Sequence, residues 1–149
     1  MDIALQFDPL QLRADMVLSG GALASDGDLR TAVILSLFTD RRALEEDVLP
    51  DASASRRGWW GDALATVGPM GSRLWLLERE KQTQGAVNRA RDYAQEALSW
   101  MVEQGVARRV VVQAETVRAG VLGLSIVIER NQAQPARYRW EMPWSQLRA

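Results

Sequence analysis

The chain has 149 residues, the usual size of one domain, and its 18 basic and 19 acidic residues leave a net charge of −1. This balance excludes a global field that would draw the protein onto DNA or a membrane, and no apolar run approaches the roughly 20 residues of a membrane span. Cysteine and histidine are absent, which excludes disulfides, iron–sulfur centres and Ser-His-Asp triads, and nearly excludes zinc enzymes.

The N-terminal part predicts two short strands or extended arms, over Asp2 to Phe7 and Arg13 to Leu18, because polar and apolar residues alternate weakly there. The apolar run from Leu29 to Phe38 follows. It is longer than a usual strand, and Asp28 before it is a good helix N-cap. We therefore predict a mostly buried helix that ends near Thr39.

The segment from Ser36 to Trp75 is the most unusual part of the sequence. Arginine and tryptophan are the residues that most often anchor protein interfaces, and long irregular loops in compact domains are usually functional or disordered. The aromatic content argues against disorder throughout, so we predict an interaction surface. Two simpler explanations stay open, namely a GC-rich genome that favours arginine codons and a tryptophan pair that caps the core. The residues that stand out are Arg41, Arg42, Arg56, Arg57, Trp59 and Trp60.

Two helices are predicted after this segment. A short one runs from Arg73 to Glu80, with Ser72 as its cap. A long one runs from about Thr83 to Gln104, where apolar residues recur every three or four positions, and Gly105 is a natural stop. Its apolar stripe consists of Ala86, Val87, Ala90, Tyr93, Ala94, Ala97, Leu98, Met101 and Val102.

Three strands are predicted to complete the chain, over Val106 to Glu115, Val121 to Glu129 and Arg137 to Met142, since apolar residues alternate with polar ones in each. Short turns separate them. The predicted fold class is therefore α+β, with a small, mainly antiparallel sheet covered on one face by the long helix and shorter helices.

Paired carboxylates are the catalytic option that the composition leaves open, because glycosidases use two carboxyl groups, one of them in a dry pocket. None of the candidates lies in a pattern that predicts a preorganised site, and no glycine-rich phosphate loop occurs. We expect no enzyme, no catalytic residue, no metal and no cofactor. The acidic candidates are Glu45, Glu46, Asp47, Asp62, Glu78 and Glu80.

The unusual segment resembles the Mu-like phage family of small baseplate wedge proteins, known by the forty-sixth gene product. The similarity extends from about Asp15 to Ile128. That family is in turn similar to the gene-twenty-five-type wedge proteins of large contractile phages and type VI secretion baseplates, which are small α+β domains. The motifs that carry the resemblance are Ser36-Leu37-Phe38-Thr39-Asp40-Arg41-Arg42-Ala43, Leu49-Pro50-Asp51, Arg57-Gly58-Trp59-Trp60-Gly61-Asp62 and Gly71-Ser72-Arg73-Leu74-Trp75-Leu76-Leu77.

The resemblance implies a structural role, as one domain over residues 1–149 in each of six wedges. Its implied partners are the larger wedge proteins, the tail tube or hub, and the sheath, with no nucleic acid and no membrane. It implies a place in the virion, at the tail baseplate, after assembly in the host cytoplasm. In the gene-twenty-five-type relatives a free strand or arm templates the sheath, so residues 1–18 or 138–149 are expected to be such an arm, since strand addition to an open sheet edge is favourable.

One motif of the relatives is changed here. They carry Glu-Pro-Arg where the long helix passes into the first strand, and it holds the wedge's helical core, whereas this chain has Val106-Ala107-Arg108. The contact is then expected at Arg108, or moved to arginines of the unusual segment. Rival functions are a lysozyme-like cell-wall hydrolase and a nucleic-acid-binding protein, although the arginines are interspersed with acidic residues rather than clustered. The predicted protein-interface residues are Arg41, Arg42, Arg56, Arg57, Trp59, Trp60, Asp62, Arg73 and Arg108.

Overall fold

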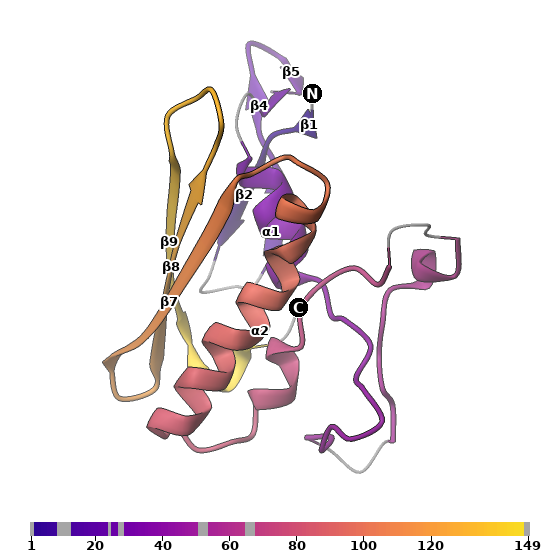
Figure 1. Cartoon of the computed structure of the whole chain (residues 1–149), viewed down its shortest axis with the longest axis vertical. Coiled ribbons are helices and arrows are strands. Elements are labelled where there is room, and N and C mark those ends of the chain that lie inside the picture. The colour runs from indigo at the N-terminus through magenta and orange to yellow at the C-terminus, as the bar shows by residue number, and fades with distance from the viewer. Residues whose placement is uncertain are drawn as a thin grey trace.

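The computed structural model describes residues 2–8, 13–23, 25–26, 29–50, 54–64 and 68–147. It has an α+β fold, as predicted, in which a three-stranded antiparallel sheet packs against a long helix (Figure 1). The helices are α1 (Arg30–Phe38) and α2 (Gln84–Glu103), and the sheet consists of β7 (Arg109–Arg118), β8 (Val121–Glu129) and β9 (Ala136–Pro143). The N-terminal strands are β1 (Asp2–Ile3), β2 (Leu5–Asp8), β3 (Arg13–Met16), β4 (Leu18–Ser19), β5 (Ala22–Leu23) and β6 (Ser25–Asp26).

Helix α2 confirms the strongest sequence prediction, and both of its ends have a chemical cause. The Thr83 side chain accepts a hydrogen bond from the Ala86 N–H at 3.2 Å, which satisfies one of the free donors of the first turn. Gly105 follows the helix with a φ of +73°, a conformation that glycine adopts without strain. Most of the predicted apolar stripe is buried, although Val102 at its end is exposed.

The sheet is a simple antiparallel meander in the order β7-β8-β9. Its inner face buries Leu122, Leu124, Ile126 and Ile128 of the central strand, which confirms the alternation read in the sequence. The first strand begins at Arg109 rather than Val106, because the chain first leaves α2 through a turn. The sheet and α2 therefore form the two layers of one hydrophobic core.

The outer edge of β7 is occupied by a glutamine from α2. The Gln95 amide donates to the Val110 carbonyl at 2.7 Å and accepts from the Val112 N–H at 3.1 Å. These backbone groups face away from β8 and would otherwise be available to another strand. The Gln95 side chain thus forms two hydrogen bonds that a neighbouring strand would otherwise form.

The N-terminal residues form short antiparallel hairpins, in line with the predicted strands. Strand β2 pairs with β3, β1 with β6, and β4 with β5, and Figure 1 shows β4 and β5 beyond the end of α1. The Thr31 hydroxyl donates to the Ile3 carbonyl at 2.9 Å and accepts from the Leu5 N–H at 3.1 Å. The hairpins are therefore attached to the body through the first turn of α1.

Helix α1 confirms the predicted buried helix, and Thr39 follows it as expected. Its predicted N-cap, Asp28, lies outside the described residues. The aromatic ring of Phe38 at the end of the helix stacks on Phe7 at 3.8 Å and meets Trp140 edge-on at 5.7 Å. These contacts join α1, β2 and β9.

The prediction of a short helix over Arg73 to Glu80 is wrong in its length. Only Leu74–Leu77 is helical, as a 3-10 turn, and all four of its residues are buried. A turn that is surrounded by protein has no solvent face to favour a longer amphipathic helix, and short 3-10 pieces are common as connectors. Among the described residues, no helix combines the length and apolar character needed to cross a membrane.

The C-terminal residues pack into the body up to Leu147. Tyr138, Trp140 and Met142 of β9 are buried, and so is Trp144 in the 3-10 turn Trp144–Gln146. The Trp144 backbone N–H donates to the Gly120 carbonyl at 2.7 Å, and its indole N–H to the Glu80 carbonyl at 2.6 Å. Residues 148 and 149 of the predicted C-terminal arm lie outside the described residues.

Candidate protein-interaction site

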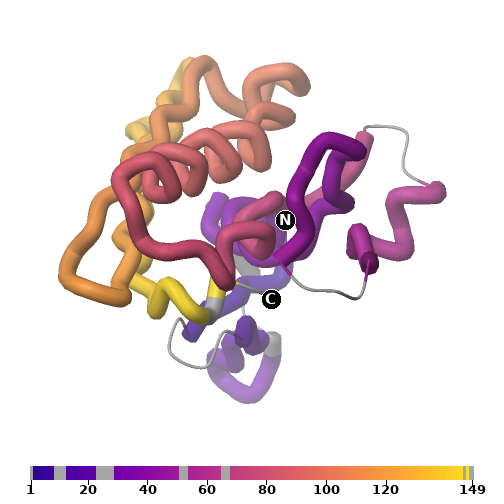
Figure 2. Tube along the Cα trace, turned by 90° about the horizontal axis from the view of Figure 1, so that it is seen from below, coloured from indigo at the N-terminus to yellow at the C-terminus, as the bar shows by residue number. Residues whose placement is uncertain are grey.

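The unusual segment forms a long excursion on the side of α2 away from the sheet, and Figures 1 and 2 both show part of it reaching out from the body. Its base is closed by backbone hydrogen bonds. The Arg41 N–H donates to the Ser72 carbonyl, and the Ser72 N–H to the Thr39 carbonyl, both at 2.9 Å. Thr39 and Arg41 thus run beside Ser72, and the Ser72 hydroxyl donates to the Leu37 carbonyl at 2.5 Å. The excursion begins and ends at a fixed point.

An ion-pair network anchors the excursion to α2. Arg73 donates to Asp47 at 2.8 Å and to Glu96 at 3.0 Å, and Arg41 pairs with the same Glu96 at 3.2 Å. The Arg73 guanidinium also lies 4.6 Å from the centre of the Tyr93 ring. Two of the predicted interface arginines, Arg41 and Arg73, are therefore mostly buried, and they hold the excursion in place.

The pKa values of Arg73 and Tyr93 are shifted by their surroundings in the network. Burial works to lower the pKa of Arg73, but the hydrogen bonds to Asp47 and Glu96 outweigh it and raise that pKa. Burial also raises the pKa of Tyr93, although the nearby Arg73 charge opposes the shift. Both groups keep their protons at neutral pH, so the network is a permanent structural feature.

Arg57 performs a similar task nearer the middle of the excursion. Its guanidinium lies 4.5 Å from the centre of the Trp75 ring, donates to Asp40 at 2.8 Å and comes within 4.0 Å of Glu78. Its backbone has a φ of +52°, which is uncommon for a residue with a side chain. These contacts compensate the backbone strain and fix the chain immediately before Gly58.

Arg73→Ala tests the network. We expect a loss of about 2 kcal/mol in the free energy of unfolding, between the values typical of exposed and fully buried pairs, because the guanidinium is 14% exposed and Asp47 would lose its partner. Arg139→Ala is the matched control. Arg139 also binds two carboxylates, those of Glu115 and Glu141, but it is 42% exposed on the outer face of the sheet. Urea denaturation with an equal loss for both variants would contradict the role of Arg73.

The tryptophan pair lies near the end of the excursion. The Trp59 ring folds over Gly61, where an added Cβ would lie 2.2 Å from the ring, so only glycine fits. Trp60 opens the 3-10 turn Trp60–Leu64, and its side chain is 81% exposed against 38% for Trp59. Neither indole is buried in the core, so the pair does not cap it. Leu64, at the end of the turn, is 83% exposed.

Asp62 connects this turn to the returning chain. Its carboxylate accepts a hydrogen bond from the Met70 N–H at 2.9 Å, and its own N–H donates to the Trp59 carbonyl at 3.0 Å. The predicted interface residue Asp62 thus positions the turn. The exposed indole of Trp60 is held on a fixed support.

The remaining predicted residues differ in position. Arg42 is exposed and donates to the Arg57 carbonyl at 3.5 Å, and Arg56 donates to the carbonyls of Leu44 and Glu45. Both belong to the excursion. Arg108 does not, because it lies just before β7 and pairs with Glu129 at 3.2 Å. It is a separate, exposed cation next to the C-terminal end of α2.

The supporting residues were not predicted from the sequence. Glu96 and Tyr93 belong to the long helix, and Trp75 lies in the buried 3-10 turn. The apolar run Leu74–Leu77 is a signal that could have indicated a buried partner for the arginines. Which carboxylate meets which guanidinium depends on tertiary contacts.

Two of the acidic candidates, Glu78 and Glu80, have arginine partners. Glu78 is buried rather than solvated, and it shares the Arg57 guanidinium with Asp40. Glu80 pairs with Arg89 on the surface. In the part of the chain that the structure describes, no group of three histidine, cysteine or acidic side chains is arranged to hold a metal ion.

An exposed indole on a rigid, polar-anchored excursion is typical of the surfaces with which proteins bind other proteins. Comparison with known sequences identifies the family of the chain. Residues 29–135 match the family described as phage protein GP46, and the chain belongs to that family.

Two relatives support the assignment. The chain is 49% identical over 116 residues to the protein named baseplate protein gp46 of Escherichia phage Mu, with 78% of this chain and 79% of the relative covered. It is 37% identical over 131 residues to the Mu-like prophage FluMu protein gp46 of Haemophilus influenzae, with 88% and 90% covered. The predicted family resemblance is confirmed.

Proposed function

We propose that this chain, a structural component of the baseplate of a Mu-like phage tail, joins the larger wedge proteins to the tail tube and to the first sheath ring. The observation that carries the proposal is the exposed pair Trp60 and Leu64 on an anchored turn, in a chain related to a baseplate protein. Large apolar side chains that stay exposed on a fixed support are typical of interface anchors.

The internal arginines support this role by reducing the entropy lost on binding. Arg57 and Arg73 hold the excursion through ion pairs and ring contacts before any partner arrives. A preorganised loop loses less conformational freedom when it docks than a flexible one. Arg42 then provides an exposed cationic group in the same excursion, with the half-buried Arg56 near it in the chain, and Arg108 provides a second cationic contact near α2.

The N-terminal hairpins are the better candidate for the sheath contact. Ile3, Met16 and Leu18 are exposed there, on short strands that extend past α1. The C-terminal residues up to Leu147 bury their aromatic side chains in the core, and releasing them as an arm would expose that core. Of the two predicted arms, residues 1–18 therefore fit the role with less disruption than residues 138–149.

The proposed role involves no catalysis. Glu78, the buried acid, lies at ion-pair distance from the Arg57 guanidinium, 4.0 Å away, so a structural contact accounts for its position. The partners we propose are wedge, tube and sheath proteins in a six-fold arrangement, without nucleic acid or membrane. The chain would be assembled in the host cytoplasm and remain in the tail baseplate of the virion.

Leu18→Asp separates the two parts of this proposal. We expect the variant to enter baseplates as the wild type does, because the side chain is exposed, but to give at least about tenfold fewer sheathed tails by electron microscopy. Val48→Asp, at another exposed apolar position, is the control and is expected to behave as wild type. Deletion of the gene should abolish both baseplates and sheaths. Complete tails without the protein would refute the structural role, and normal sheaths with Leu18→Asp would refute the hairpin contact.

A further inference from the structure

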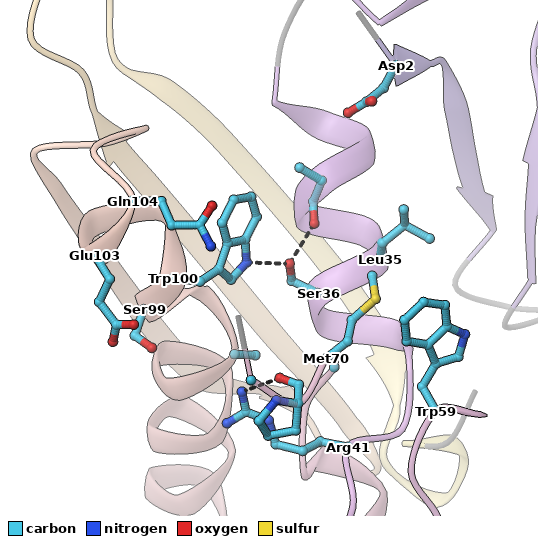
Figure 3. A pocket seen from close by; sticks show the side chains of 15 residues that line it. Asp2, Leu35, Ser36, Arg41, Trp59, Met70, Ser99, Trp100, Glu103 and Gln104 are labelled. Atoms are coloured by element: carbon cyan, nitrogen blue, oxygen red, sulfur yellow. Dashed lines mark hydrogen bonds between the residues drawn. The ribbon is translucent and has the colours of Figure 1, made fainter. Parts of the chain in front are cut away.

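A groove of about 530 Å³ separates α1 from the C-terminal half of α2, next to the loop Gly68–Gly71 (Figure 3). Its lining is mainly apolar and combines small and large side chains from three parts of the chain. Leu35 is 40% exposed there, and Trp59 of the excursion lies at the same opening. The apolar side chains of the lining are Ala32, Leu35, Trp59, Met70, Ala97 and Trp100.

The walls of the groove are held by hydrogen bonds. The Trp100 indole N–H donates to the Ser36 hydroxyl at 2.9 Å, and Ser36 donates to the Ala32 carbonyl at 2.7 Å. Arg41 donates to the Pro69 carbonyl at 2.9 Å, which holds the third wall. The groove is thus preformed, and these polar groups of its walls are bonded within the protein.

The opening of the groove carries negative charge. Asp2 and Glu103 line it, and among the described residues neither forms an ion pair. Arg41, the one cation of the lining, is bound to Glu96 and Pro69. A partner that brings a cationic group would therefore find two acceptors that no cation of the described residues occupies.

We propose that the groove binds an amphipathic helix of another baseplate protein, with its apolar face between α1 and α2 and a Lys or Arg beside Glu103. This inference rests on the proposed role in baseplate assembly. A helix fits because it satisfies its own backbone hydrogen bonds, whereas an extended peptide would place unpaired N–H and C=O groups against a mainly apolar lining. The acidic rim selects a basic helix over an acidic one.

The groove is continuous with the exposed turn of the candidate site. Trp59 lines the groove, and its ring lies 5.4 Å from that of Trp60. A helix seated in the groove would therefore reach the exposed indole as well. One partner would contact both surfaces, which explains why the turn is held at this place.

Two variants test the groove, with the wedge complex of the same phage, purified without this chain, as the probe. Leu35→Lys puts a charge at an exposed position of the apolar wall and is expected to weaken binding at least about tenfold. Glu103→Arg reverses the rim charge and should weaken binding at low salt, with a smaller effect at high salt. Val48→Lys, exposed and outside the lining, is the matched control.

A photo-crosslinking residue at position 35 identifies the occupant. We expect it to link to a helical segment that has one apolar face and carries Lys or Arg. Wild-type affinity in both Leu35→Lys and Glu103→Arg, or a link to a second copy or to an extended strand, would overturn the inference. If the wild-type chain itself does not bind the wedge, the proposed function fails instead, so that the two failures are distinguishable.

Discussion

Trp60→Ala is expected to leave the fold intact and to prevent incorporation into baseplates. The side chain is 81% exposed and its main ring contact is with Trp59, so the midpoint of thermal unfolding should not change. A central indole anchor contributes about 3 kcal/mol to binding, which corresponds to a more than hundredfold loss of affinity for the wedge. Co-purification and titration with the wedge proteins measure this loss.

Val48→Ala is the matched control, since Val48 is an exposed apolar side chain of the same excursion that lies outside the tryptophan turn. It should bind as wild type does. If Trp60→Ala also binds normally, the turn is not an anchor, and the exposed indole has another use.

Gly71→Ala is expected to destabilise the fold by about 3 kcal/mol. Gly71 has a φ of +99°, and an added Cβ would lie 2.3 Å from the Thr39 carbonyl oxygen, at the point where the excursion closes. The variant must both adopt a conformation that disfavours side chains and separate the hydrogen-bonded segments around Ser72. Urea denaturation gives the change in the free energy of unfolding.

Gly68→Ala measures the first effect, the backbone strain, by itself. Gly68 has a similar φ of +91°, but an added Cβ there meets nothing within 4 Å. We expect a loss of about 1 kcal/mol, from backbone strain alone. Losses of the same size for both glycines would mean that the contact with Thr39 relaxes without difficulty.

The layers of the fold were predictable because their signals are local. The stripe along α2 and the alternation in β8 and β9 repeat over successive residues, and each pattern directly reports one buried face. The 3-10 turn Leu74–Leu77 was misread because all of its side chains are buried, which removes the periodicity on which a helix boundary depends.

The candidate site was predictable only as a region. The gathering of arginine and tryptophan indicated the excursion, which lies within the residues that match the family. Which arginines are structural could not be predicted, since Arg73 pairs with Asp47 and Glu96, which are 26 and 23 residues away in the sequence. A sequence shows that guanidinium groups are present, but their pairing depends on how the helix and the excursion meet.

Gln95, on the outer edge of β7, affects how the protein behaves before it is assembled. Free strand edges invite identical chains to stack through backbone hydrogen bonds. The Val110 carbonyl and the Val112 N–H are already bonded to Gln95, so these groups cannot pair with a strand of another chain. The pool of unassembled subunits is thereby protected from one route to premature aggregation.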